Sequence, residues 1–181
     1  VGDDLWTASG YGNDGHLMRL SGNNSNWTTW DVDTNDIPDG YGADILLCHD
    51  IVHVAIGFSA WQWWAVGGGI ARFDLGDHDG DGIAEEWLSP ITNDNSNMAD
   101  KDVRALACDE ENEIMYVGFD ADNVGIDRFD YSSNNFLATL TPDMGVSENP
   151  VFPGGMLYDD DLLLVSHYDG GGGITRVITS G

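Results

Sequence analysis

The chain alternates short apolar runs with polar clusters. The runs are rich in Val, Ile, Leu, Trp and Tyr, and the clusters between them are rich in Gly, Asn and Asp. Apolar positions at helical spacing are nearly absent, whereas short β-branched and aromatic runs bounded by turn residues are typical of strands. The sequence therefore predicts an all-β protein built from many short antiparallel strands.

One phrase recurs four times along the chain. It occurs as GHLMRLS, GIARFD, GIDRFD and GITRVI, at residues 15–21, 69–74, 125–130 and 173–178. The phrase places four arginines at one repeat position, about 50 residues apart: Arg19, Arg72, Arg128 and Arg176. We expect these arginines to pack their stems along the sheet and to pair with acids of the neighbouring unit.

The strands around each phrase define a larger unit. A second apolar run precedes every phrase, three units have a further run upstream, and three have one downstream. A period of about 50 residues with four strands per unit is typical of a β-propeller, whereas a β-sandwich would not repeat at this period. We predict an arc of about four four-stranded antiparallel blades in a single segment, at residues 1–34, 35–98, 99–145 and 146–181.

The third unit, VRALACDEENEIMYVGFDADNVGIDRFD, carries a family resemblance. It resembles the two-component regulator propeller repeat at five positions, which are Leu106, Asp109, Met115, Tyr116 and Gly118. Glu113 departs from that repeat, because it stands in a turn where the repeat usually has glycine. The resemblance implies propeller blades, and it suggests a ligand-sensing ectodomain as one setting.

The first predicted unit lacks its first strand, and the last lacks its fourth. Strands at both ends of the arc would then be open, and open edges favour association. We expect additional blades, a partner chain or a second copy of the chain to complete the ring. The chain opens on VGDDLW without an initiator Met or a signal peptide, so we also expect it to be a piece of a longer product.

The segment GDHDGDGIAEEW predicts a cation site. Aspartates stand at loop positions one, three and five, as Asp77, Asp79 and Asp81. The glycine at position six permits a sharp turn, Ile83 can offer its carbonyl, and Glu85 stands at position nine. Hard cations such as Ca²⁺ bind oxygen ligands of this kind, so we predict a calcium site; the alternative is a solvated acidic turn.

The loop differs from an EF-hand. Position twelve is Leu88, where an EF-hand needs a bidentate Glu, and no helical pattern flanks the loop. The motif DxDxDGxxE is instead similar to the calcium hairpins of integrin α-subunit propellers, with Glu replacing Asp at the last ligand and Glu86 as a competing residue. The repeat places this loop between the third and fourth strands of one blade. Because only one unit has the loop, we expect the ion to stabilise the local structure.

Charge limits the range of partners. The chain has 32 acidic and 6 basic residues and a formal net charge of −26. Such a surface repels nucleic acid and anionic lipid, so we expect no nucleic-acid partner and no membrane insertion. It suits a salty medium, in which counterions screen the self-repulsion.

The two cysteines, Cys48 and Cys108, both fall in apolar strand-like runs. Two cysteines allow one bridge at most, which excludes a disulfide framework. We expect both residues to be buried free thiols.

The loops joining second and third strands are the expected ligand face, opposite the calcium hairpin. Their candidate ligand-binding residues are Trp61, Gln62, Trp63, Trp64, Asp120, Asp122 and Asp169. Exposed Trp offers a flat surface for sugar rings or proteins, although these side chains could instead pack between blades.

Catalytic motifs are absent from the sequence, and acidic loop residues are uninformative in so acidic a chain. The leading hypothesis is a non-catalytic calcium-binding propeller module, extracellular or at the cell surface, that binds a protein or glycan. The alternatives are a propeller hydrolase or lyase acting on a polysaccharide or small ester, and a ligand-sensing ectodomain.

Overall fold

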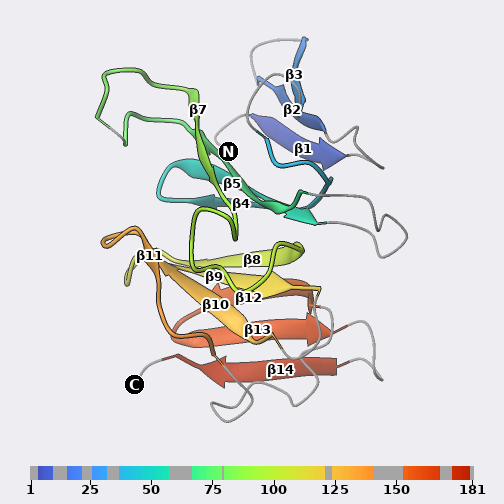
Figure 1. Cartoon of the computed structure of the whole chain (residues 1–181), viewed down its shortest axis with the longest axis vertical. Helices are drawn as coiled ribbons and strands as arrows, with labels where there is room; N and C mark the ends of the chain where they lie inside the picture. Colours follow the sequence, from blue (N-terminus) through green and yellow to red (C-terminus); the bar gives the residue numbers. More distant parts are fainter. Residues whose placement is uncertain are drawn as a thin grey trace.

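The computed structural model describes residues 4–9, 16–21, 26–31, 37–57, 67–78, 80–120, 124–140, 153–167 and 173–179. These residues form four antiparallel sheets, which confirms the all-β prediction (Figure 1). We call the sheets blades 1 to 4 in chain order. Within each blade the strands pair with their sequence neighbours.

The two middle blades have four strands each. Blade 2 contains β4 (Tyr41–Cys48), β5 (Ile51–Gly57), β6 (Gly69–Asp74) and β7 (Glu86–Ile91). Blade 3 contains β8 (Val103–Asp109), β9 (Ile114–Phe119), β10 (Ile126–Asp130) and the two-residue β11 (Asn135–Phe136). Their first strands, β4 and β8, contact each other.

The two outer blades have three strands each in the described part of the chain. Blade 1 contains β1 (Leu5–Ser9), β2 (His16–Leu20) and β3 (Trp27–Asp31). Blade 4 contains β12 (Pro153–Asp159), β13 (Leu162–His167) and β14 (Gly173–Ile178). The two blades lie at opposite ends of the arc, which agrees with the predicted unit pattern (Figure 1).

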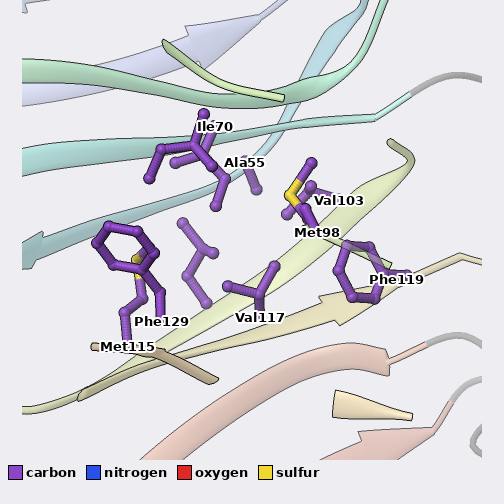
Figure 2. Packing of buried hydrophobic residues seen from close by; sticks show 10 residues of the cluster. Ala55, Ile70, Met98, Val103, Met115, Val117, Phe119 and Phe129 are labelled. Carbon is purple, nitrogen blue, oxygen red and sulfur yellow. The ribbon is translucent and has the colours of Figure 1, made fainter. Parts of the chain in front are cut away.

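The blades pack face to face through the same repeat positions. We call the face of a blade that packs on the following blade its forward face, and the opposite one its backward face. Two residues before the repeated arginine, Leu17, Ile70 and Ile126 lie on the forward faces of blades 1, 2 and 3 and are buried. Figure 2 shows the middle interface, where Ala55 and Ile70 of blade 2 face Val117 of blade 3.

The two cysteines correct one prediction. Cys48 ends β4, Cys108 lies one residue before the end of β8, and the two form a disulfide with their Cα atoms 5.9 Å apart. The prediction of free thiols was wrong because it treated each apolar run by itself. Blade stacking brings the ends of two first strands together, although 60 residues separate the cysteines in sequence.

The repeated arginines only partly follow the prediction. Arg72 donates from Nε and Nη2 to the carbonyl oxygen of Ser89, at 3.0 and 2.7 Å. Arg128 binds the Ala138 carbonyl oxygen in the same way, at 3.1 and 2.9 Å. The expected acid pairs were wrong for these two, because an irregular outer segment of their own blade supplies a carbonyl acceptor. Arg19 does pair with acids, as described below.

Candidate ligand cleft and calcium hairpin

The acidic hairpin joins β6 to β7, as the sequence predicts. Gly80 and Gly82 adopt left-handed conformations, with φ of 78° and 89°. The Asp77 Oδ1 atom accepts a hydrogen bond from the Gly82 amide at 3.1 Å, and Asp81 Oδ1 accepts one from the Ile83 amide at 2.8 Å. Both carboxylates therefore lie over one sharply turned loop and are exposed to solvent. Asp79 lies outside the described residues.

Glu85 is engaged by the preceding blade. Its Oε1 atom lies 3.0 Å from Arg19 Nη2 on β2, and Arg19 also pairs with Asp4 at 2.6 Å. The backbone of Glu85 is left-handed, with φ of 61°. In this structure the predicted ninth-position ligand thus links blades 1 and 2. The predicted ligands Asp77 and Asp81 instead accept the backbone hydrogen bonds described above.

Asp74 anchors the start of the hairpin. This buried residue ends β6 and accepts hydrogen bonds from the amides of Gly76 and His78, each at 2.7 Å. Its Oδ1 atom also lies 2.6 Å from His78 Nδ1. Burial by itself would raise the pKa of Asp74, but these hydrogen bonds together hold it below its usual value. The anchored carboxylate fixes His78 relative to the sheet.

A cleft of about 520 Å³ opens beside the hairpin, between blades 2 and 3. It is lined by His49, Ile51, Arg72, His78, Leu88, Ser89, Glu113, Tyr131, Ser132 and Asn134. These residues come from β5, β6 and β7 and from the turns that follow β4, β6, β8 and β10. The cleft therefore lies on the same face as the hairpin, and His78 belongs to both.

Two aromatic rings form one wall of the cleft. His49 and Asp50 make a two-residue turn with φ of 52° and 56°, a conformation that Asn and Gly adopt more readily. The His49 ring lies 4.8 Å from the Tyr131 ring, measured between centroids. Tyr131 is held in turn by a 2.8 Å hydrogen bond between its hydroxyl and His53 Nε2. The turn thus places an imidazole ring against a fixed phenol.

His53 supports this wall from within the protein. Its side chain is fully buried, and burial, assisted by the charge of Arg72, lowers its pKa to about 3. The ring is therefore neutral at physiological pH. Burial also raises the pKa of Tyr131. The pair is consequently an uncharged, hydrogen-bonded support for the cleft.

The ligand residues predicted from sequence lie elsewhere. Trp61, Gln62, Trp63, Trp64, Asp122 and Asp169 fall outside the described residues. Asp120 follows β9, at the end of that strand remote from Glu113, and forms an ion pair with Arg104. Its amide donates to the Asp102 carbonyl oxygen at 2.9 Å. Asp120 is thus engaged with the residues at the start of β8, in its own blade.

Sequence reasoning missed the cleft because its residues are scattered over several separate turns. One feature of the sequence could have pointed to the cleft. The pair His49-Asp50 connects two apolar runs at a place where a tight hairpin usually has Asn-Gly, so its side chains are unusual for such a turn. A second grouping, of Cys48, His49 and Cys108, has its ligand atoms within 4.8 Å of one another. Because the two sulfur atoms are joined in the disulfide, neither is a thiolate ligand.

Comparison with known proteins establishes the fold. No protein-family model matches the sequence, and no curated protein matches it. PorZ, a surface component of the type-IX secretion system of Porphyromonas gingivalis, superposes with a TM-score of 0.65 at 19% identity, over 97% of this chain and 24% of PorZ. Sqt1 from Saccharomyces cerevisiae gives 0.57 at 12% identity, over 90% of this chain and 39% of Sqt1.

The chain is an arc of a β-propeller. Its four sheets of three or four strands match part of each larger protein, and it spans well under half the length of either. At such low identities the similarity concerns the fold alone. No helix in the described ranges has the length and hydropathy needed to span a membrane.

Proposed function

We propose that this arc is a non-catalytic, extracytoplasmic, calcium-binding module that binds a glycan in the cleft between blades 2 and 3. One observation carries the proposal: His78 belongs both to the aspartate hairpin and to the wall of the cleft. An ion that orders the hairpin would thereby order part of the ligand site.

The disulfide supports an extracytoplasmic location. Disulfides form and persist in oxidising compartments and are rare in the cytosol. The bond joins Cys48 of blade 2 to Cys108 of blade 3, and Cys48 is completely buried. An oxidising, calcium-replete environment suits both this bond and the hairpin.

Calcium would balance the charge of the hairpin. Asp77, Asp79 and Asp81 place three carboxylates in one short loop, which is unfavourable unless a cation neutralises them. Asp77 and Asp81 already lie over the turned backbone, and the Ile83 carbonyl is the ligand expected at loop position seven. With calcium bound, we expect the ordered loop to reinforce the position in which Asp74 holds His78 at the cleft.

The lining of the cleft fits a sugar better than a purely apolar ligand. Tyr131 and His49 supply ring surfaces, while Ser132, Asn134 and Glu113 supply polar groups that can meet hydroxyls. The volume of about 520 Å³ is within the usual range for small-ligand sites.

The number of carboxylates in the lining of the cleft favours binding of a glycan over its hydrolysis. Glycoside hydrolysis generally needs two carboxyl groups on either side of the scissile bond. Among the described lining residues, Glu113 is the only one with a carboxylate. We therefore propose recognition of the glycan without its cleavage.

A glycan array with calcium present, followed by calorimetry on the positive ligands, tests the proposal. His49→Asn keeps a residue suited to the left-handed turn but removes the ring, and Glu113→Gln removes the charge; each is expected to weaken binding about tenfold or more. Glu111→Gln, in the same turn as Glu113 but outside the cleft lining, is the matched control and should bind normally.

Two results would contradict this site. One is glycan binding that survives both cleft variants but is lost in Trp61→Ala or Trp64→Ala, because the ligand would then bind at the loop between β5 and β6. The other is turnover of the bound glycan, because it would favour the enzyme alternative.

A further inference from the structure

Within the part of the chain that the structure describes, no blade packs on the forward face of blade 4. Ile174 on β14 and Leu157 on β12 are 72% and 60% exposed, although both lie on regular strands. Exposed side chains of this size on one sheet face are a typical feature of a protein interface. The equivalent positions in the other blades show what covers this face elsewhere in the chain.

Ile174 occupies a position that is buried in every other blade. It stands two residues before Arg176, as Leu17, Ile70 and Ile126 stand before the other repeated arginines. Those three residues are 3%, 0% and 2% exposed, because each packs on the backward face of the following blade. Ile174 therefore occupies a blade-to-blade contact position, but no following blade packs on it in the described ranges.

Leu157 gives the same result from another strand. Leu157 pairs with Leu164 on the next strand, and Leu164 pairs with Arg176. In blade 3, the residue of β8 that has the same place relative to the repeated arginine is Ala107. Ala107 is 3% exposed and packs on blade 4. The forward face of blade 4 therefore has the residues of a blade interface on two strands.

Among the described residues, the backward face of blade 1 has no neighbouring blade either. Leu5 on β1 is 57% exposed, and Trp27 on β3 lies in the same cross-strand row at 45%. The positions equivalent to Leu5 are Val52, Met115 and Leu163, each completely buried. The described residues thus leave one blade face of each kind unpaired, at opposite ends of the arc (Figure 1).

We propose that these two faces bind each other between two copies of this chain. The forward face of blade 4 in each copy packs on the backward face of blade 1 in the other, in the geometry already present three times within the chain. The two contacts are related by a twofold axis and close a ring. Two arcs of four blades make eight, which lies within the size range of known propellers.

Charge sets a condition on this association. Each copy has a formal net charge of −26, so two copies repel at low ionic strength. Salt screens that repulsion, while the apolar contact is unaffected or strengthened. We expect dimerisation to become tighter as salt increases, the opposite of an interface built on ion pairs.

Light scattering after size exclusion, across a salt series, tests the proposal on the 181-residue chain. The expected mass is twice 19.6 kDa at high salt. Ile174→Asp and Leu5→Asp should each give monomers, since each places a charge in both contacts of the ring. Leu137→Asp, at another exposed apolar residue off the two faces, is the matched control and should remain dimeric.

The two variants also distinguish this ring from other dimers. A dimer through blade 4 alone would be insensitive to Leu5→Asp, and one through blade 1 alone would be insensitive to Ile174→Asp. Either result overturns the proposal, as does a wild-type monomer at high salt or a ladder of larger masses. Both substitutions are at exposed positions, and an unchanged far-ultraviolet circular dichroism spectrum with a cooperative melt will show that each variant is folded. None of these outcomes depends on calcium or glycan binding.

Discussion

Cys48 on β4 and Cys108 on β8 join the first strands of two neighbouring blades through a disulfide. The bond lies directly before the turn that carries His49, so it secures the cleft side of the interface between blades 2 and 3. The same interface contains the largest of the three buried clusters. A covalent bond and an apolar core thus hold together the two blades between which the cleft lies.

Removing the disulfide should lower stability substantially. The bond closes a loop with a sequence separation of 60, and native disulfides of this kind typically contribute about 2–4 kcal/mol. We expect the double variant Cys48→Ser, Cys108→Ser to unfold at a correspondingly lower urea concentration. Wild-type protein in reductant should behave like the variant, and the variant should not respond to reductant. Equal midpoints for wild type and variant would contradict this role.

Releasing Glu85 should strengthen calcium binding. If Glu85 is the ninth-position ligand, the ion must first break its pair with Arg19, which costs about 0.5–1 kcal/mol for a pair of this exposure. Arg19→Gln should then lower the calcium dissociation constant about two- to fivefold in calorimetric titrations. Arg176→Gln removes the same charge at the equivalent repeat position of blade 4 and is the control. Equal effects in both variants would indicate a response to net charge alone.

His53 should make the protein less stable in acid. Its folded-state pKa of about 3 lies below the ordinary value of 6.5, so the unfolded chain binds the extra proton first. The neutral ring therefore contributes stability that is present above pH 6.5 and is lost as the pH falls toward 3, by up to about 1.4 kcal/mol per pH unit. Urea unfolding over this range measures the slope.

His53→Gln is the matched variant, because its amide can still bind the Tyr131 hydroxyl but does not titrate. Its unfolding free energy should fall less steeply between pH 6.5 and 3 than that of the wild type. Asp44 and Asp127, whose pKa values are raised by burial, are present in both proteins. The difference between the two slopes thus isolates His53, and parallel slopes would exclude it as the source.

The strands could be predicted from the sequence because local pattern and repeat agree. Ile70 and Ile126 occupy one place in a recurring phrase, and that place is buried wherever a following blade exists. The number of strands in each unit follows from the same alignment. Alternation within a strand and repetition between units are both properties of the linear chain, so no tertiary information was needed.

The remaining features depend on how the blades stack. The Cys48–Cys108 bond joins two runs that look alike as buried strands, and nothing within either run shows that their ends meet. Arg72 was expected to pair with an acid, but it binds the Ser89 carbonyl that an irregular β7 leaves available. The cleft likewise assembles His49 and Tyr131 from turns in different blades. Such contacts are set by three-dimensional packing, which sequence periodicity does not specify.

Calorimetric titration of calcium into the chelated protein tests the hairpin most directly. We predict one ion per chain, a large loss of affinity in Asp81→Asn, and normal binding in Asp94→Asn, which removes an exposed acid outside the hairpin. Saturation at a hundredfold excess over the dissociation constant should stabilise the fold by about 2.7 kcal/mol. The chelated protein should remain folded at room temperature but melt at a lower temperature. The absence of calcium binding at millimolar concentration would contradict the site and the function built on it.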